Sequence, residues 1–301
     1  MTATLAAQRR AASVVGYQLH HGDALDWLAS ADRCSIQAVV TDPPYGVVEY
    51  TPSQLDKRRN GNGGVWRLPP SFDGATRQPV PRFTVLTEAE RAAVREFFAV
   101  FAERLLPVLV PGAHLFVATT PVVSHLLYEP LVAAGFEKRG EIVRIVKTLR
   151  GGDRPKNAHE DYPDVSVMPR ACWEPWGLFR KPIEGRVSDN LRRYGTGGLR
   201  RISGDTPFRD LIECGPARRT ERDIAPHPSL KPQALMRQLV HASLPLGTGT
   251  VLDPFCGSGA TLAAAEALGI ASVGVECDRG FYDLATEAIP RLAALDAPPR
   301  L

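Results

Sequence analysis

Residues 251–259 have the sequence Val-Leu-Asp-Pro-Phe-Cys-Gly-Ser-Gly, and this stretch decides the fold class. An apolar strand runs into a turn with two glycines, and apolar residues from Ala260 onward predict a helix. Glycine lets the backbone approach a ligand closely, and the free amides of a helix start face whatever binds there. About 20 residues later, Glu276 ends the next predicted strand, where an acid can accept hydrogen bonds from both ribose hydroxyls of a nucleoside. The stretch therefore predicts an α/β nucleoside-binding unit.

Predicted strands alternate with predicted helices over most of the chain. Gly257 and Gly259 supply only G-x-G, so the three-glycine fingerprint of a dinucleotide site is incomplete, which disfavours a nicotinamide oxidoreductase. Thr87 and Glu90 predict a capping box at the start of a long helix. The alternation predicts a parallel, doubly wound, Rossmann-like sheet. We expect strands at 14–19, 36–41, 113–118, 141–146, 250–252 and 272–275, and helices at 24–31, 87–109, up to about 134, 232–243, 260–268 and from 279.

A second motif, Asp42-Pro43-Pro44-Tyr45-Gly46, follows the apolar run of residues 36–41. The two prolines fix the backbone and remove two amide donors, which leaves carbonyl acceptors beside a carboxylate. Such a site suits the two hydrogens of an amino group, and the ring of Tyr45 offers a flat face for a base. The alternative is a strand-ending turn with a surface acid. Residues 68–72 (Leu-Pro-Pro-Ser-Phe) have the same prolines without an acid or a preceding strand, so we predict a loop there.

Two long stretches rich in Gly, Pro and Arg, 46–87 and 151–226, interrupt the alternation. A loop of this length inside a compact domain is usually functional. Lys and Arg outnumber Asp and Glu by 18 to 13 between residues 139 and 223, against 18 to 20 elsewhere. We expect 151–226 to be an insertion outside the scaffold, and we expect its residues 151–222 to form, with 46–87, a surface for nucleic-acid phosphates. The alternative is a solvated arginine-rich surface. The arginines expected at the phosphates are Arg192, Arg193, Arg200 and Arg201.

Composition excludes several classes of protein. No apolar run approaches the roughly 20 residues that cross a bilayer. The two N-terminal arginines are not followed by an apolar segment, so we expect no secretory signal. The five cysteines are an odd number without a C-x-x-C pair, which argues against a zinc site and a disulfide framework. We expect a cytoplasmic protein.

The motif at residues 42–46, followed later in the chain by the glycine turn of residues 251–259, resembles the amino-group DNA methyltransferases. The catalytic motif lies N-terminal to the cofactor glycines, as in the circularly permuted β class of that family. Residues 20–25 (His-His-Gly-Asp-Ala-Leu) resemble the family's segment whose acid contacts the adenine of the cofactor. Residues 227–232 (His-Pro-Ser-Leu-Lys-Pro) resemble the segment that enters the cofactor pocket. The resemblance covers 13–45 and 227–285, whereas 46–226 matches only in layout, so the recognised DNA sequence cannot be carried over.

The resemblance implies a site-specific enzyme that transfers a methyl group from S-adenosylmethionine to N6 of a flipped-out adenine in double-stranded DNA, without a metal. It implies one domain made of a catalytic half (13–150), a target-recognition insertion (151–226) and a cofactor-binding half (227–290). The implied catalytic residues are Asp42, Pro43, Pro44 and Tyr45. The implied cofactor-binding residues are Asp23, Ser229, Lys231, Asp253, Pro254, Phe255, Gly257, Gly259, Thr261 and Glu276.

Other functions stay open at this point. Methylation of cytosine N4 is the main alternative, since relatives with that activity more often carry Ser-Pro-Pro-Tyr but the division is imperfect. Tyr45 argues mildly against RNA adenine methylation, whose permuted relatives carry a tryptophan there. Protein-glutamine methyltransferases have an Asn-Pro-Pro-Tyr motif and the reverse motif order, and a non-enzymatic binder would be expected to have lost Asp42 or the glycines. A second copy of the chain and a cognate restriction or defence nuclease are possible partners.

Overall fold

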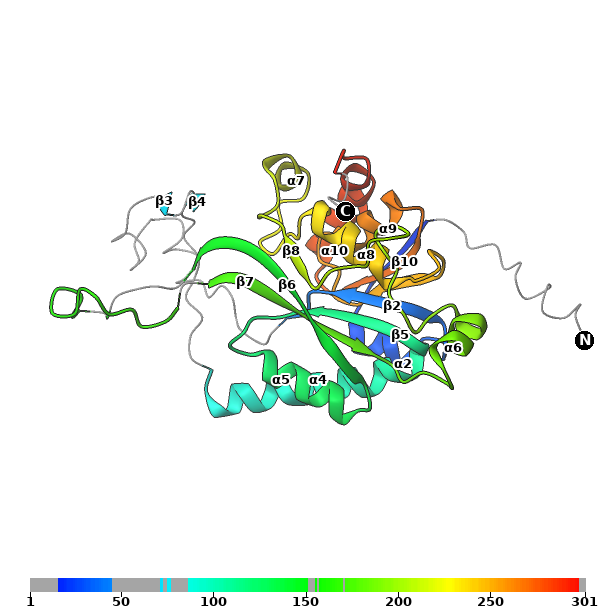
Figure 1. Ribbon diagram of the computed structural model, residues 1–301. Coiled ribbons are helices and arrows are strands. Elements are labelled where there is room, and N and C mark those ends of the chain that lie inside the picture. The colour runs from blue at the N-terminus through cyan, green and yellow to red at the C-terminus, as the bar shows by residue number, and fades with distance from the viewer. Residues whose placement is uncertain are drawn as a thin grey trace, which may run out of the picture.

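The computed structural model describes residues 16–44, 71–72, 75–76, 86–150, 155, 157–169 and 171–297. Eight strands form one twisted sheet (Figure 1). Their order is β1 (Tyr17–His21), β10 (Ala271–Glu276), β9 (Thr250–Asp253), β2 (Ile36–Thr41), β5 (Leu109–Ala118), β7 (Ala171–Arg180), β6 (Glu137–Arg150) and β8 (Leu211–Glu213). The first five strands are mutually parallel, which confirms the Rossmann-like α/β class.

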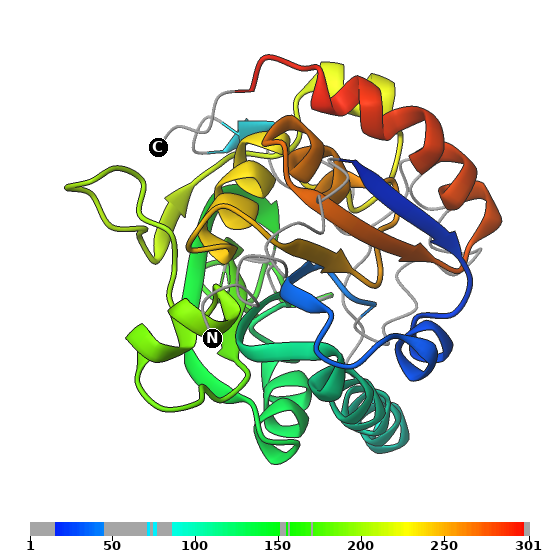
Figure 2. The ribbon, with the colours of Figure 1, turned by 90° about the vertical axis from the view of Figure 1, so that its right-hand side faces the viewer.

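Helices cover both faces of the sheet, as a doubly wound fold requires. One face packs against α2 (Ala24–Ser30), α4 (Glu88–Val108) and α5 (Ser124–Ala133). The other face packs against α8 (Gln233–Ser243), α9 (Ala260–Ala267) and α10 (Arg279–Ala293). Figure 2 shows the two layers, with β1 beside β10 although these strands come from opposite ends of the chain. Two short helices, α6 (Val187–Tyr194) and α7 (Arg219–Ile224), lie between β7 and α8 in the sequence.

Helix α4 forms where the sequence predicts it. The hydroxyl of Thr87 accepts a hydrogen bond from the Glu90 amide, and the Glu90 carboxylate accepts one from the Thr87 amide, so the predicted capping box is confirmed. Phe98, Phe101 and Leu105 are fully buried on one face of this helix. Phe97 and Phe101 also contact the ring of Phe255, with centroids 5.9 and 5.5 Å apart. The helix thereby supports the turn that follows β9.

The expectation that 151–226 lies outside the scaffold is wrong for β7. This strand is inserted antiparallel between β5 and β6, and it places Trp176 and Phe179 in the core. The sequence does not predict this strand, because Pro175 and Gly177 interrupt the strand propensity. Burial on both faces also removes the alternation of polar and apolar residues. Whether the remainder of 151–226 recognises the target stays a prediction.

Most of the loop 46–87 lies outside the described residues. Within it, the short strands β3 (Ser71–Phe72) and β4 (Ala75–Thr76) pair antiparallel, so the end of the predicted loop 68–72 is a strand. Among the described residues, no helix combines the length and the apolar character needed to cross a membrane.

Candidate active site

Two neighbouring strands, β9 and β2, lie at the point where the chain changes direction across the sheet. After β9 the chain continues through α9 to β10 on one side, and after β2 it continues to β5 on the other side. Ligands of doubly wound folds bind in the crevice outside the carboxyl ends of the strands at such a switch point. Asp253 ends β9 and Asp42 directly follows β2, so the two motifs of the sequence meet there.

The carboxylate of Asp253 ties these two strands together. One oxygen accepts hydrogen bonds from the Thr41 hydroxyl (2.7 Å) and the Phe255 amide (3.2 Å). The other oxygen accepts a hydrogen bond of 2.5 Å from the Thr261 hydroxyl. Burial raises the pKa of Asp253 to about 6, although these hydrogen bonds oppose the shift. Asp253 therefore holds the turn between β9 and α9 in place by accepting hydrogen bonds from other groups of the protein.

Both glycines of the turn have left-handed backbones, with φ of +52° at Gly257 and +81° at Gly259. A Cβ at Gly259 would overlap the side chain of Ile289 on α10, so this glycine is required for helix packing. A Cβ at Gly257 would lie 3.1 Å from the ring of His227, which faces the candidate site. Pro254 is buried between Asp253 and the half-buried Phe255, where it shapes the same turn.

Glu276 is buried at the end of β10, and its two oxygens accept hydrogen bonds of 2.8 Å from the amides of Gly257 and Asp278. Asp23 lies on the adjacent strand edge, because β1 and β10 are paired in parallel and the Gly22 amide donates to the Glu276 carbonyl (2.9 Å). The Asp23 side chain caps α2 by accepting from the amides of Leu25 and Asp26. The structure thus brings the two acids that were expected at the ribose and the adenine to one edge.

The segment 227–232 reaches this edge from the other side. The ring of His227 packs edge-on against Phe281, with centroids 4.3 Å apart, and its Nδ1 accepts a hydrogen bond from the Ser229 amide (3.2 Å). Burial lowers the pKa of His227, although the nearby Asp42 carboxylate opposes this shift. His227, Ser229 and Lys231 line one cavity together with residues from both motifs, among them Asp42, Asp253, Phe255, Gly257 and Thr261.

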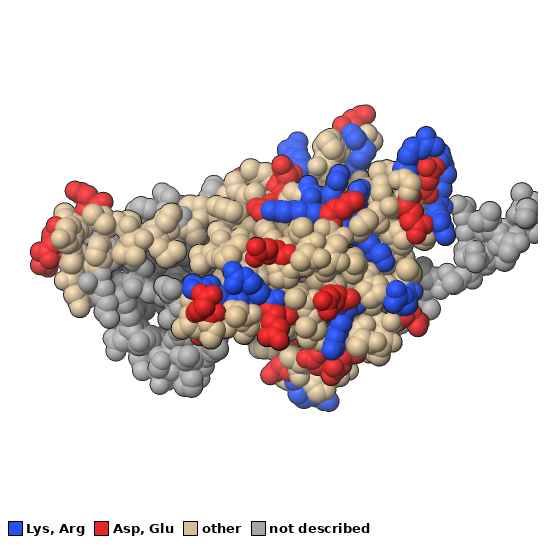
Figure 3. Space-filling model, turned by 90° about the horizontal axis from the view of Figure 1, so that it is seen from below, with Lys and Arg blue, Asp and Glu red and all other residues tan. Residues whose placement is uncertain are grey.

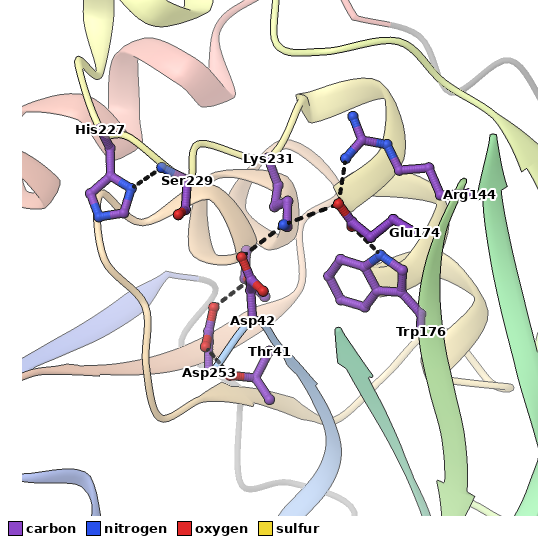
Figure 4. A network of polar contacts seen from close by, with 10 residues as sticks. Thr41, Asp42, Arg144, Glu174, Trp176, His227, Ser229, Lys231 and Asp253 are labelled. Atoms are coloured by element: carbon purple, nitrogen blue, oxygen red, sulfur yellow. Dashed lines mark hydrogen bonds and ion pairs between the residues drawn. The ribbon is translucent and has the colours of Figure 1, made fainter. Parts of the chain in front are cut away.

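Lys231 connects the catalytic motif to the rest of the site (Figure 4). Its ammonium forms an ion pair with Asp42 Oδ2 at 2.8 Å and lies 3.4 Å from Glu174 Oε2 of β7. Arg144 of β6 pairs with the same Glu174 oxygen at 3.3 Å. The lysine is therefore a largely buried group held between two carboxylates, and not a solvated residue at a helix start.

The remaining residues of the predicted catalytic motif are only partly described. Pro43 is buried and Pro44 is exposed at the carboxyl end of β2. Tyr45 lies outside the described residues. The structure thus places Asp42 in the lining of the cavity with both prolines directly after it in the chain, and the expected stacking of Tyr45 on a base stays a prediction.

The arginines expected at nucleic-acid phosphates lie far from this cavity. Asn190 of α6 donates hydrogen bonds to the Pro111 carbonyl near the start of β5, and the Arg200 amide donates to Ala242 at the end of α8. Both contacts are at the amino edge of the parallel strands, opposite Asp42. Arg192 and Arg193 also pair with Asp189 (3.0 Å) and Glu184 (2.7 Å). These arginines therefore do not lie beside Asp42, and whether they contact DNA phosphates stays a prediction.

Comparison with solved structures identifies the class of fold to which the chain is similar. A protein from Thermus thermophilus that is described as a putative DNA modification methylase superimposes with a TM-score of 0.58 at 21% identity, covering 92% of this chain and 96% of that one. The PvuII DNA methyltransferase, described as cytosine-N4-specific, superimposes with a TM-score of 0.59 at 14% identity, covering 94% of this chain and 88% of that one. The chain thus has the Rossmann-like fold of DNA methyltransferases.

Sequence comparison narrows the class. The N6/N4 family of DNA methylases matches residues 150–287. The type II methyltransferase M.HindIII of Haemophilus influenzae is 23% identical over 298 residues, which cover 90% of this chain and 94% of that protein. The chain is thus similar to DNA methyltransferases of the N6/N4 family, and the Thermus thermophilus neighbour has also been solved in complex with S-adenosylmethionine. The residues of the site fit this cofactor, because the glycine turn, Glu276 and Asp23 surround the edge where a nucleoside binds in such folds.

Sequence reasoning missed several residues of the site. Thr41 and Glu174 are each distant in the chain from the charged group that they contact, and for Thr41 nothing local indicates its role. A signal was present for Glu174, since an acid between Trp173 and Trp176 in an apolar run requires a buried partner. His227 belongs to a segment that resembles the family's pocket motif, but its contact with the glycine turn is visible only in three dimensions.

Proposed function

We propose that this chain methylates N6 of adenine in double-stranded DNA. The observation that supports this is the position of Asp42, whose carboxylate lies at the switch point beside the turn of the cofactor-binding half. A carboxylate and a proline carbonyl at this position can accept both hydrogens of an exocyclic amine. Such acceptors favour an amine with its lone pair turned out of the ring plane, toward a methyl donor.

In this mechanism the target base leaves the duplex, because an amine cannot be reached inside the base stack, at a cost of a few kcal/mol. Asp42 and the Pro43 carbonyl hold the amino hydrogens, Pro44 fixes the loop, and Tyr45 stacks on the base. When bound, S-adenosylmethionine supplies an electrophilic methyl group on a sulfonium. The protein contributes mainly positioning and electrostatics, since methyl transfer is a single displacement once the groups are aligned.

The cofactor site that we propose consists of the residues expected from the sequence, with different roles. Glu276 and Asp23 would accept hydrogen bonds from the nucleoside, and Ser229 and Phe255 would line its pocket. Asp253, Thr261 and Gly259 would act by shaping the turn, because Asp253 and Thr261 are buried and bonded to each other and Gly259 packs against Ile289. Titration calorimetry should show weaker S-adenosylmethionine binding for Gly257→Asp and Glu276→Ala than for the wild type. Equal affinities would contradict the assignment, and the exposed Asp283→Ala is the control.

The test of the reaction is Asp42→Ala. Loss of one preorganised acceptor typically costs roughly 100- to 1,000-fold in rate, while the variant should remain folded and bind S-adenosylmethionine nearly as well as the wild type. The assay is tritiated methyl transfer to duplex DNA, followed by mass spectrometry of the nucleosides. Asp32→Ala, which removes an exposed carboxylate elsewhere on the protein, is the matched control. A fully active Asp42→Ala protein would end this mechanism.

Cytosine N4 is the second candidate, and one observation favours it. The structural neighbour described as cytosine-N4-specific has a fold as similar as that of the other neighbours. The acceptors of Asp42 and Pro43 suit either amine, so the preference for adenine rests on the aspartate of the motif. Detection of N4-methylcytosine as the product would show that cytosine N4, and not adenine N6, is the target. Because M.HindIII is a type II methyltransferase, a cognate restriction nuclease is a proposed partner, as is a second copy of the chain.

A further inference from the structure

Four charged side chains alternate in sign across the floor of the site (Figure 4). Arg144, Glu174, Lys231 and Asp42 come from β6, β7, the segment before α8 and the end of β2. Successive charged atoms lie 3.3, 3.4 and 2.8 Å apart. Because each charge lies between or beside opposite charges, the row is electrically neutral as a whole and can be buried.

Arg144 and Glu174, at the end of the row away from Asp42, are rigidly held. Arg144 is 4% exposed, and it donates hydrogen bonds to the carbonyls of Cys214 (3.0 Å) and Gly215 (2.6 Å) beyond β8. The other oxygen of Glu174 accepts a hydrogen bond of 2.8 Å from the indole of Trp176, which is fully buried. Both carboxylate oxygens of Glu174 are therefore occupied, so this side chain has one orientation.

At the Asp42 end of the row, the Lys231 ammonium can exchange one carboxylate partner for the other. Burial disfavours the Lys231 ammonium, but the carboxylates of Asp42 and Glu174 outweigh burial and raise its pKa. Burial also disfavours an ionised Glu174, and Lys231 and Arg144 outweigh it and lower the pKa of Glu174. The lysine is thus charged and has two carboxylates within reach, only one of which, Asp42, belongs to the catalytic motif.

We propose that Lys231 and Glu174 are positioning residues for Asp42. Lys231 orients the Asp42 carboxylate before DNA arrives, and Glu174 retains the ammonium when the target amine takes over the Asp42 oxygens. Without Glu174, binding of the amine would leave a buried lysine without a carboxylate, so the ammonium and the amine would compete for Asp42. This inference rests on the proposed function, because it requires Asp42 to accept the amine hydrogens.

The first test is Glu174→Gln, which keeps an acceptor for Trp176 but removes the charge. Misplacement of a catalytic group by a small distance can cost about 100-fold in rate, so we expect kcat to fall by about that factor. The dissociation constants for S-adenosylmethionine and DNA should stay within about twofold. Removing one partner of a buried ion pair also destabilises proteins, so melting temperatures are measured alongside.

The matched control is Glu137→Gln. Glu137 pairs with the buried Arg180 at 2.6 Å on the same two strands, β6 and β7, but at the opposite edge of the sheet. Its removal should lower the melting temperature in the same way and leave kcat unchanged. If Glu137→Gln lowers kcat as much as Glu174→Gln, the effect is general destabilisation and the inference fails.

The decisive test is a double-mutant cycle with Lys231→Met. If Glu174 acts through Lys231, the double variant is no slower than Lys231→Met alone, whereas independent roles multiply the two losses. Should Glu174→Gln alone fail to fold, the comparison of the double variant with Lys231→Met still decides the question. Multiplied losses, or a Glu174→Gln enzyme as fast as the wild type, would overturn the inference. A wild type that methylates no DNA would instead overturn the proposed function.

Discussion

At the scale of single residues, Asp253 shows how burial changes the role of an acid. Its position before the glycine turn suggests a ligand of the cofactor, yet its oxygens are occupied by Thr41, Thr261 and the Phe255 amide. The contact with Thr41 joins residues 212 positions apart in the sequence. The acid therefore acts first as the connection between the two halves of the site.

The raised pKa of Asp253 gives a testable dependence of stability on pH. A carboxyl group with a pKa of about 6 in the folded protein, against 3.8 as its ordinary value, binds its proton more tightly when folded. Its contribution to the free energy of unfolding is therefore present below pH 3.8 and is lost as the pH rises through about 6. The loss should amount to about 3 kcal/mol.

The measurement is urea unfolding of the wild type and of Asp253→Asn at several pH values. The free energy of unfolding of the wild type, relative to the variant, should fall between about pH 4 and pH 7. A difference that stays constant over this range would show that the pKa of Asp253 is ordinary.

At the scale of elements, the turn between β9 and α9 depends on two glycines for different reasons. The left-handed φ of Gly257 and Gly259 disfavours a side chain at either position. Only at Gly259 would a Cβ also collide with a neighbouring helix, through the side chain of Ile289. The G-x-G pattern thus reflects packing of α9 on α10 as well as access for a ligand.

Gly269 provides a control for this interpretation, because it has a φ of +66° with open space around it. We expect Gly269→Ala to cost about 1 kcal/mol from backbone strain alone. Gly259→Ala should cost a further 1–3 kcal/mol or so from overpacking. Thermal or urea unfolding measures both, and equal losses would show that α10 moves aside without cost.

At the scale of the whole molecule, the region 151–226 is divided between the two edges of the sheet. Helix α6 lies at the amino edge, whereas Cys214 and Gly215 lie at the edge that carries Asp42, and Glu221 of the following α7 accepts a hydrogen bond from the Gln233 amide at the start of α8. The segment 157–169 projects beyond the ends of β6 and β7, and its tip carries acidic side chains and no basic ones (Figure 3). On the face shown there, basic and acidic side chains are interspersed, so charge does not mark a DNA surface.

We therefore expect the phosphates to meet α7 and not α6. Arg219 on α7 is 89% exposed and pairs with Asp223 at 3.7 Å, and Arg192 on α6 is 75% exposed and pairs with Asp189 at 3.0 Å. Arg219→Gln should weaken DNA binding and reduce its salt slope by about one unit. Arg192→Gln, a similarly paired arginine at the far edge, should change neither. The reverse result would place the DNA on the amino edge.

The class of fold and the two motifs, in their order along the chain, could be predicted from the amino-acid sequence alone. These features are local: a capping box at Thr87, a glycine turn after an apolar strand, and two prolines after an acid depend on residues close in sequence. Strand β7 was not predicted, because Pro175 and Gly177 interrupt the local strand pattern. Burial in the folded protein still makes this segment a strand.

Which charged groups form pairs with one another could be seen only in the folded protein. The pairing of Lys231 with Asp42 and Glu174, and the placement of Arg192 away from them, follow from the directions of β2, β5 and β7 in one sheet. Strand direction is set by how the whole chain packs, and a composition rich in arginine carries no information about which edge of the sheet receives each residue. Local chemistry therefore predicted the parts of the site, and burial and topology determined how they act together.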